Sequence, residues 1–174
     1  MELSEIIIRP VETSDVAALS VFSIESFFDT YGDYNTPGDM QEYADKYFIV
    51  EKLLEELKAP AIYYFIALHK DEIVGYFKLR DLLHPPETKD LKPIELERIY
   101  VSRFCKRQGI GNLLMRNACS IAKEKGYKSL WLGVWEKNEK AIQFYKSFGY
   151  KIIGKQNFLL GQDLQQDWQM LIEL

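Results

Sequence analysis

The sequence predicts one domain of the mixed α/β (α+β) class, and three observations lead to that prediction. A length of 174 residues is typical of a single domain. A hydrophobic fraction of 47% is enough for an ordinary core that needs no metal or disulfide. Short runs of β-branched and aromatic residues alternate with segments of helical periodicity, in the order β-α-α-β-β-β-α-β-α-β-β.

The N-terminal third predicts one strand and two helical stretches, at residues 5–9, 13–31 and 40–58. Thr13 or Ser14 can cap the first helix, because a side-chain hydroxyl there accepts from free amides of the first turn. The β-branched pair Ile49 and Val50 interrupts a run of good helix formers. We therefore expect a break in the second helical stretch near residues 48–50.

The rest of the chain predicts strands at 62–69, 73–81, 94–101, 128–135, 150–160 and 167–174, and helices at 111–126 and 138–149. The strands are rich in β-branched and aromatic residues, and a glycine ends each helix. Pro85, Pro86 and Pro93 predict a loop over residues 84–93, because proline cannot donate to a strand ladder.

Composition excludes several classes of function. The net charge of −4 argues against nucleic acid as the main partner. The longest apolar run, residues 61–68, is far shorter than the roughly 20 residues of a membrane span. Cys105 and Cys119 show neither a disulfide framework nor metal-ligand spacing, which suits a reducing compartment. We expect a soluble cytoplasmic protein without a metal, a nucleic-acid partner or a membrane partner.

The stretch FCKRQGIGNLLMR, residues 104–116, places glycines at the start of a predicted helix. Free backbone amides and the helix dipole favour an anion at such a position. Gly109 and Gly111 leave room for a ligand near the main chain, and Lys106 and Arg107 add positive charge. The loop suggests a pyrophosphate cradle, although a plain strand-to-helix turn would use the same glycines. Leu114 stands where a dinucleotide fingerprint needs its third glycine.

Two segments together resemble a known family. KRQGIG is similar to the [QR]-x-x-G-x-[GA] acetyl-CoA signature of the GNAT N-acetyltransferases. NEKAIQFYKSFGY resembles their second signature, N-x-x-A-x-x-F-Y-x-x-x-G-F/Y. LERIYV and WLGVWEKNEKAIQFY look like the PaiA-type spermidine/spermine N-acetyltransferases of that family. One departure is Lys106 at the first signature position, since lysine cannot make the bidentate contact of arginine.

The resemblance implies a single GNAT-like domain over residues 1–174. Its sheet would be mixed and mostly antiparallel, with splayed central strands and flanking helices. The pantetheine of acetyl-CoA would enter between residues 98–101 and 129–135, where Gly133 is consistent with a close approach. Asn138 would bond the pantetheine arm, cap its helix, or do both. The implied acetyl-CoA site comprises Ile99, Tyr100, Val101, Lys106, Arg107, Gln108, Gly109, Ile110, Gly111, Asn112, Asn138, Ala141 and Tyr145.

Acetyl transfer to an amine requires two proton movements. An amine of pKa about 10.4 is mostly protonated at neutral pH and must lose a proton before it attacks. Glu97 is the candidate base, directly or through a water, and Glu95 on the same strand face is its rival. Tyr145 is the candidate acid for the departing thiolate. Both could instead be structural, Glu97 as a solvated strand residue and Tyr145 as a core aromatic. An amide near Ile99 or Tyr100 would meet the developing oxyanion.

Residues 11–45 contain eight acidic residues and no lysine or arginine. In the family this region lines the acceptor site, and an acidic wall attracts a cationic acceptor. The resulting substrate-binding candidates are Glu25, Asp29, Tyr31 and Asp33, and the resulting acceptor is spermidine or spermine. Solvated helix residues would give the same pattern. The alternatives are a protein or peptide N-acetyltransferase and a CoA-binding sensor with little turnover. A homodimer is possible, because dimers are common in the family.

Overall fold

The computed structural model describes residues 2–174, except for the side chains of Glu87, Lys89 and Asp90. Its helices are α1 (Val16–Tyr31), α2 (Pro37–Tyr47), α3 (Val50–Leu57), α4 (Ile110–Glu124) and α5 (Glu139–Ser147). Its strands are β1 (Ile7–Pro10), β2 (Ile62–His69), β3 (Glu72–Arg80), β4 (Pro93–Val101), β5 (Ser129–Trp135), β6 (Lys151–Leu160) and β7 (Asp163–Glu173). Short 3₁₀ turns cover Leu3–Glu5, Thr13–Asp15, Pro86–Leu91 and Arg103–Cys105. None of the described helices is both long and apolar enough to cross a membrane.

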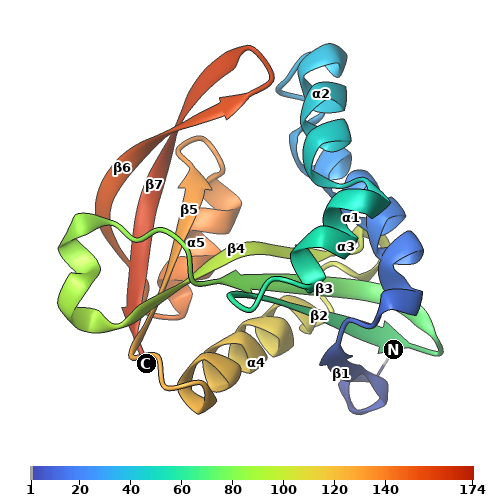
Figure 1. The fold of residues 1–174 in the computed structure, drawn as a ribbon, viewed down its shortest axis with the longest axis horizontal. Helices are drawn as coiled ribbons and strands as arrows, with labels where there is room; N and C mark the ends of the chain where they lie inside the picture. Colours follow the sequence, from blue (N-terminus) through green and yellow to red (C-terminus); the bar gives the residue numbers. More distant parts are fainter. Residues whose placement is uncertain (1) are drawn as a thin grey trace.

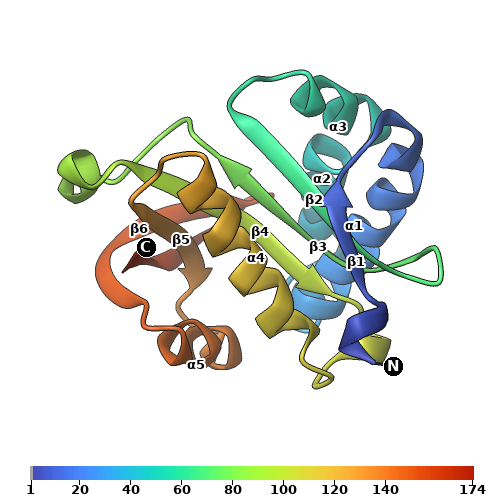
Figure 2. The same cartoon turned by 90° about the horizontal axis from the view of Figure 1, so that it is seen from below.

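The strands form one sheet in the order β1-β2-β3-β4-β5-β7-β6. Every neighbouring pair is antiparallel except β4 and β5, which run parallel. Helices α1, α2 and α3 lie over one face of the sheet, and α4 lies on the other (Figure 1). Seen from below, α4 crosses β3 and β4 while α5 lies beside β5 (Figure 2). The predicted α/β fold with a mostly antiparallel sheet and flanking helices is confirmed.

The parallel pair β4 and β5 separates after a short paired segment. Only Pro93, Ile94 and Glu95 pair with β5, opposite Ser129–Trp131. On its other side, β4 shifts register against β3, because Lys78 faces Arg98 while Leu79 faces Leu96. Glu97 is thus the extra residue of a β-bulge, which bends a strand and interrupts its pairing. The short pairing of β4 with β5 is the predicted splay of the central strands, and the bulge lies just beyond its last pair.

Buried apolar residues support both faces of the sheet. The larger cluster joins α4 to the central strands and includes Phe77, Ile94, Leu114 and Met115. A second cluster packs α1 and α3 against β2 and β3, and a third joins α1 and α2 to the end of β6. The sheet is therefore covered on both faces around the separation of β4 and β5.

Several element boundaries differ from the prediction. The first strand was expected at residues 5–9, but a 3₁₀ turn ends at Glu5 and β1 runs to Pro10. Pro93 was expected in a loop, yet it is the first residue of β4, a position where proline costs no ladder donor. The last strand begins at Asp163, earlier than the predicted residue 167. The break near residues 48–50 is confirmed, with the Phe48 carbonyl accepting from the buried Ser20 hydroxyl at 2.6 Å.

Candidate active site

Two cavities meet where β4 and β5 separate. The first, here the strand cavity, has a volume of about 190 Å³ and lies between β4, β5 and α5. The second, here the hairpin cavity, measures about 130 Å³ and lies between α1, α2, β4 and the β6–β7 hairpin. Both are lined by Tyr31, Glu97, Arg98, Tyr100 and Gly133. These shared residues form the boundary at which the two cavities adjoin.

The strand cavity collects about half of the predicted acetyl-CoA residues. It is lined by Ile99, Tyr100, Val101, Lys106, Asn138, Ala141 and Tyr145. After Glu95, β4 has no partner on its β5 side among the residues described, so its free amides and carbonyls face the opening. A ligand with amide groups of its own, such as pantetheine, fits this free strand edge.

The remaining predicted residues form the loop and first turn of α4. Gly109 is the N-cap at φ +85°, a conformation that favours glycine, and Arg107 also has positive φ. A Cβ on Gly111 would lie 3.6 Å from Phe144, an ordinary contact. Packing within the chain therefore does not require glycine there, which fits close approach by a ligand. Lys106, Arg107, Gln108 and Asn112 are exposed, whereas the Ile110 side chain is buried in the core.

Asn138 and Tyr145 lie on the α5 side of the strand cavity. Asn138 Oδ1 accepts from the Ala141 amide at 3.2 Å, so its predicted capping role is confirmed. Tyr145 packs between Phe144 and Tyr150. Burial, with a smaller contribution from Tyr31, raises the pKa of the Tyr145 phenol above its ordinary value. The phenol is therefore protonated at neutral pH and able to donate.

Glu97 lies in a network of buried ion pairs. Its carboxylate oxygens are 2.5 Å from Lys78 Nζ and 2.7 Å from Arg80 Nη1. Lys78, which is 1% exposed, also pairs with Glu56 at 2.8 Å. Burial alone would raise the pKa of Glu97, but Arg98, Lys78 and Arg80 outweigh burial and hold that pKa below its usual value. Such a carboxylate is a weak proton acceptor.

Glu95 shares one cation, Arg80, with Glu97. Arg80 donates to both carboxylates, with Nε 2.5 Å from Glu95 and Nη1 2.7 Å from Glu97. Burial raises the pKa of Glu95 and the contact with Arg80 only partly offsets it. The paired glutamates of β4 are thus held by arginine before any substrate arrives.

The hairpin cavity also contains Asp167 of β7, which sequence reasoning missed. Asp167 is only 8% exposed and belongs to none of the ion pairs found within residues 2–174. Burial raises the pKa of Asp167 to about 6, while a hydrogen bond from Gln156 opposes the rise. The available signal was the alternation of Gln165, Asp167 and Gln169 in the last strand, which predicts a polar face.

The acidic residues predicted to line the acceptor site do not converge on it. Glu25 and Asp33 are exposed and line neither cavity. Asp29 pairs with Arg103 at 3.2 Å, and only Tyr31 of this set lines the cavities. Helix α1 packs its apolar side into the core, so its carboxylates turn to solvent. Substrate roles for Glu25, Asp29 and Asp33 stay predictions that the cavities do not support.

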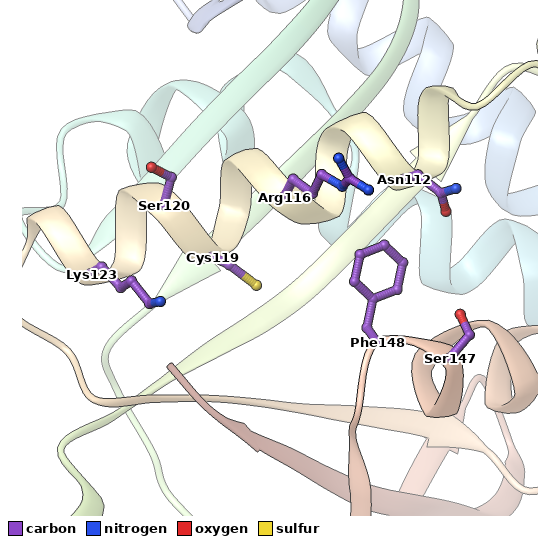
Figure 3. Close-up of a pocket in the computed structure, with 7 residues that line it drawn as sticks. All are labelled: Asn112, Arg116, Cys119, Ser120, Lys123, Ser147 and Phe148. Carbon is purple, nitrogen blue, oxygen red and sulfur yellow. The ribbon is translucent and has the colours of Figure 1, made fainter.

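A third groove lies between α4 and the end of α5. Asn112, Arg116 and Cys119 of α4 face Ser147 and Phe148, and Ser120 and Lys123 complete its lining (Figure 3). The groove begins in the first turn of α4, next to the glycine loop. Arg116 and Lys123 give it positive charge, so it suits an anionic group.

Comparisons with known proteins agree with this geometry. Residues 24–150 match the model of the Acetyltransferase (GNAT) family, and the chain belongs to that family. It is 34% identical to an uncharacterized N-acetyltransferase of Lactobacillus delbrueckii subsp. lactis over 91% of both proteins. It is 30% identical to an uncharacterized N-acetyltransferase of Mycobacterium tuberculosis, over 79% of this chain and 84% of that protein.

Solved structures show the same fold. The crystal structure of the PaiA N-acetyltransferase of Thermoplasma acidophilum, in complex with coenzyme A, superimposes with a TM-score of 0.81. It covers 97% of this chain and 99% of that one, at 22% identity. The chain is therefore an N-acetyltransferase of the GNAT family, with acetyl-CoA as its acetyl donor.

Proposed function

We propose that the chain acetylates a primary amine of a small cationic acceptor, with the polyamines spermidine and spermine as first candidates. The observation that carries this proposal is the meeting of the two cavities at the separation of β4 and β5. The donor enters from the strand cavity and the acceptor from the hairpin cavity. The amine then attacks the thioester directly in a ternary complex.

The donor side follows the resemblance to the family. The free edge of β4 at Ile99 and Val101 contacts pantetheine, and Asn138 positions its arm. The amides of residues 106–111 hold the pyrophosphate at the start of α4. The groove with Arg116 and Lys123 then takes the phosphorylated adenosine end of the donor, since it continues from the same turn.

Two proton transfers accompany the reaction. Tyr145 gives its proton to the sulfur as the carbon–sulfur bond breaks, a role that its protonated state supports. The sequence predicts Glu97 as the base for the acceptor. The ion pairs of Glu97 with Lys78 and Arg80 weaken that assignment, because they stabilise the ionised carboxylate. An amide near Ile99 or Tyr100 remains our candidate for the oxyanion.

The shape of the hairpin cavity favours a small acceptor over a peptide. Aromatic side chains of Phe27, Tyr43, Trp135 and Phe158 line it and suit an aliphatic chain that carries ammonium groups. The hairpin tip also contacts α2, where the Gln162 amide donates to Asp39 Oδ1 at 2.7 Å. This contact closes one side of the region, which an extended protein substrate would need open.

The proposal is tested by following thiol release from acetyl-CoA with a panel of acceptors. The panel includes spermidine, spermine, shorter diamines and peptides with a free N-terminus or lysine. We expect the highest kcat/KM with a small polyamine. Faster turnover of peptides would favour the protein N-acetyltransferase alternative. Tight acetyl-CoA binding without thiol release from any amine would favour the sensor.

A further inference from the structure

We propose that Asp167 binds the acceptor ammonium and accepts its proton, and that Gln156 and Gln169 hold the carboxylate in position. This inference rests on the proposed amine acetylation and assigns one of its residues. It concerns β7, outside the two sequence signatures.

Asp167 lies where the acceptor nitrogen must arrive. It faces Trp135 of β5 and Gln156 of β6 in the strand registers. Its Oδ2 lies 3.2 Å from the position that a Cβ would take on Gly133. Gly133 lines both cavities, so the carboxylate is next to the boundary between the donor and acceptor sides.

The other charges in the hairpin cavity already have partners. Arg80 binds Glu95 and Glu97, and Arg98 donates to Tyr64 Oη and lies 3.8 Å from Glu97. Asp167 is the one carboxylate of this cavity that has no ion pair in the described part of the chain. A buried carboxylate without a counter-ion is costly, so an incoming ammonium supplies what the site lacks.

A pair of hydrogen-bonded glutamines, Gln156 and Gln169, lies beside Asp167 and presents a donor to it. Gln169 Nε2 donates to Gln156 Oε1 at 3.1 Å, which leaves the Gln156 Nε2 group free to donate to Asp167. That nitrogen lies 2.5 Å from the position of a Cβ on Gly133. The absence of a side chain at Gly133 therefore makes room for Gln156. Gly133 thus accommodates Gln156 as well as an approaching ligand.

The surroundings of Asp167 suit a base at neutral pH. Burial, and to a lesser extent Glu136 just after β5, raise the pKa of Asp167 to about 6, while Gln156 lowers it. From α1, Tyr31 faces it as a neutral phenol, since burial raises the pKa of Tyr31 to about 12. Across the cavity, β3 and β4 contribute the ion-paired groups Arg80, Glu95, Glu97 and Arg98. A catalytic base works best with a pKa near the operating pH.

Asp167 and Tyr145 handle the two protons of the reaction. The Asp167 carboxylate takes one proton from R–NH₃⁺ and later releases it to solvent. The neutral nitrogen then forms a bond to the acetyl carbon. The carbon–sulfur bond breaks, and the departing thiolate takes the proton of Tyr145. The nitrogen then loses its second proton, which returns Tyr145 to its protonated form. The products are R–NH–acetyl, free CoA thiol and one proton.

The test is the pH dependence of kcat/KM for the best amine of the panel. In the wild-type enzyme, activity requires ionised Asp167, so we expect it to fall as the pH drops through about 6. Asp167→Asn should lower kcat/KM about 100-fold near neutral pH. Its remaining activity should rise about tenfold per pH unit, because only the free amine of pKa about 10.4 then reacts. Coenzyme A affinity should not change.

Two further variants separate a role in proton transfer from a structural one. Asp163→Asn is the matched control, an exposed aspartate on the same strand, and should keep the wild-type profile. Gln156→Leu removes a donor that lowers the pKa of Asp167. The fall of kcat/KM at low pH should therefore occur at a higher pH in Gln156→Leu than in the wild-type enzyme, although Asp167 is still present.

A wild-type profile in Asp167→Asn, with active wild-type enzyme, would overturn this inference and leave amine acetylation intact. Loss of the acidic limb in Glu97→Gln but not in Asp167→Asn would assign the base to Glu97. Absence of thiol release by the wild-type enzyme with every amine would instead contradict the proposed function itself.

Discussion

The pKa of a buried carboxylate shifts in opposite directions on the two walls of the hairpin cavity, which are formed by β4 and β7. On the β4 wall, Glu97 is surrounded by Lys78, Arg80 and Arg98, and its pKa lies below the usual value. On the β7 wall, Asp167 is also buried but has no ion pair in the described part of the chain, and its pKa rises to about 6. Burial disfavours charge on both walls, and nearby cations decide the outcome. The ion pairs of Glu97 thus stabilise the fold, whereas Asp167 is suited to exchange a proton with the acceptor.

The largest expected effect is the loss of stability when the ion pairs of Glu97 on the β4 wall are removed. Glu97→Gln removes the shared partner of Lys78, Arg80 and Arg98, and leaves buried cations uncompensated. We expect the free energy of unfolding to fall by about 3 kcal/mol near neutral pH, measured by urea unfolding. The loss should shrink as the pH falls below about 4, because a carboxylate with a lowered pKa stabilises only while ionised. Glu25→Gln, on an exposed residue, should change stability by less than about 0.5 kcal/mol.

The next effect concerns Tyr145, the proposed proton donor on the α5 side of the strand cavity. Tyr145→Phe keeps the aromatic ring but removes the hydroxyl, so we expect kcat to fall about 100-fold. The dissociation constant of coenzyme A, measured by calorimetry, should stay the same. Tyr127→Phe is a control far from the cavities, since Tyr127 donates to Asp81. An unchanged kcat in Tyr145→Phe would remove the acid role.

The third effect is a gain in stability, opposite in sign to the loss expected for Glu97→Gln. In folded protein the pKa of Asp167 is about 6, above the value of about 3.9 for an unfolded aspartate. Ionisation of Asp167 therefore costs stability as the pH rises from about 4 to 6. Asp167→Asn should raise the free energy of unfolding by about 2 kcal/mol near pH 8, and by almost nothing near pH 4. Destabilisation at both values would show that Asp167 supports the fold as Glu97 does.

The smallest effect is expected at the acidic surface of α1. Asp29 pairs with Arg103 and lines neither cavity. We expect Asp29→Asn to change KM for spermidine less than about twofold, because an exposed pair contributes little. Steady-state kinetics at fixed ionic strength would check this. A tenfold rise in KM would instead indicate that Asp29 of α1, and not Asp167 of β7, binds the ammonium group.

The sequence predicted what depends on neighbours in the chain. The cap at Asn138 and the break after Tyr47 follow from residues a few positions apart. The spacing of the two signature motifs then indicated the family. The sequence was enough to select Glu97 as a candidate base, but it did not predict the cations that pair with it. Lys78 and Arg80 reach Glu97 from β3 across a bulge that no local pattern reveals.

Only the tertiary structure decided which carboxylates face the acceptor. Strand β7 inserts between β5 and β6, and this order brings Asp167 over Gly133 and beside Gln156. The same packing leaves Glu25 of α1 and Asp33 in the following turn exposed to solvent. Local periodicity predicts which residues share a face of a helix or strand. The charge state of a carboxylate depends on burial and on partners distant in sequence, which the fold alone brings together.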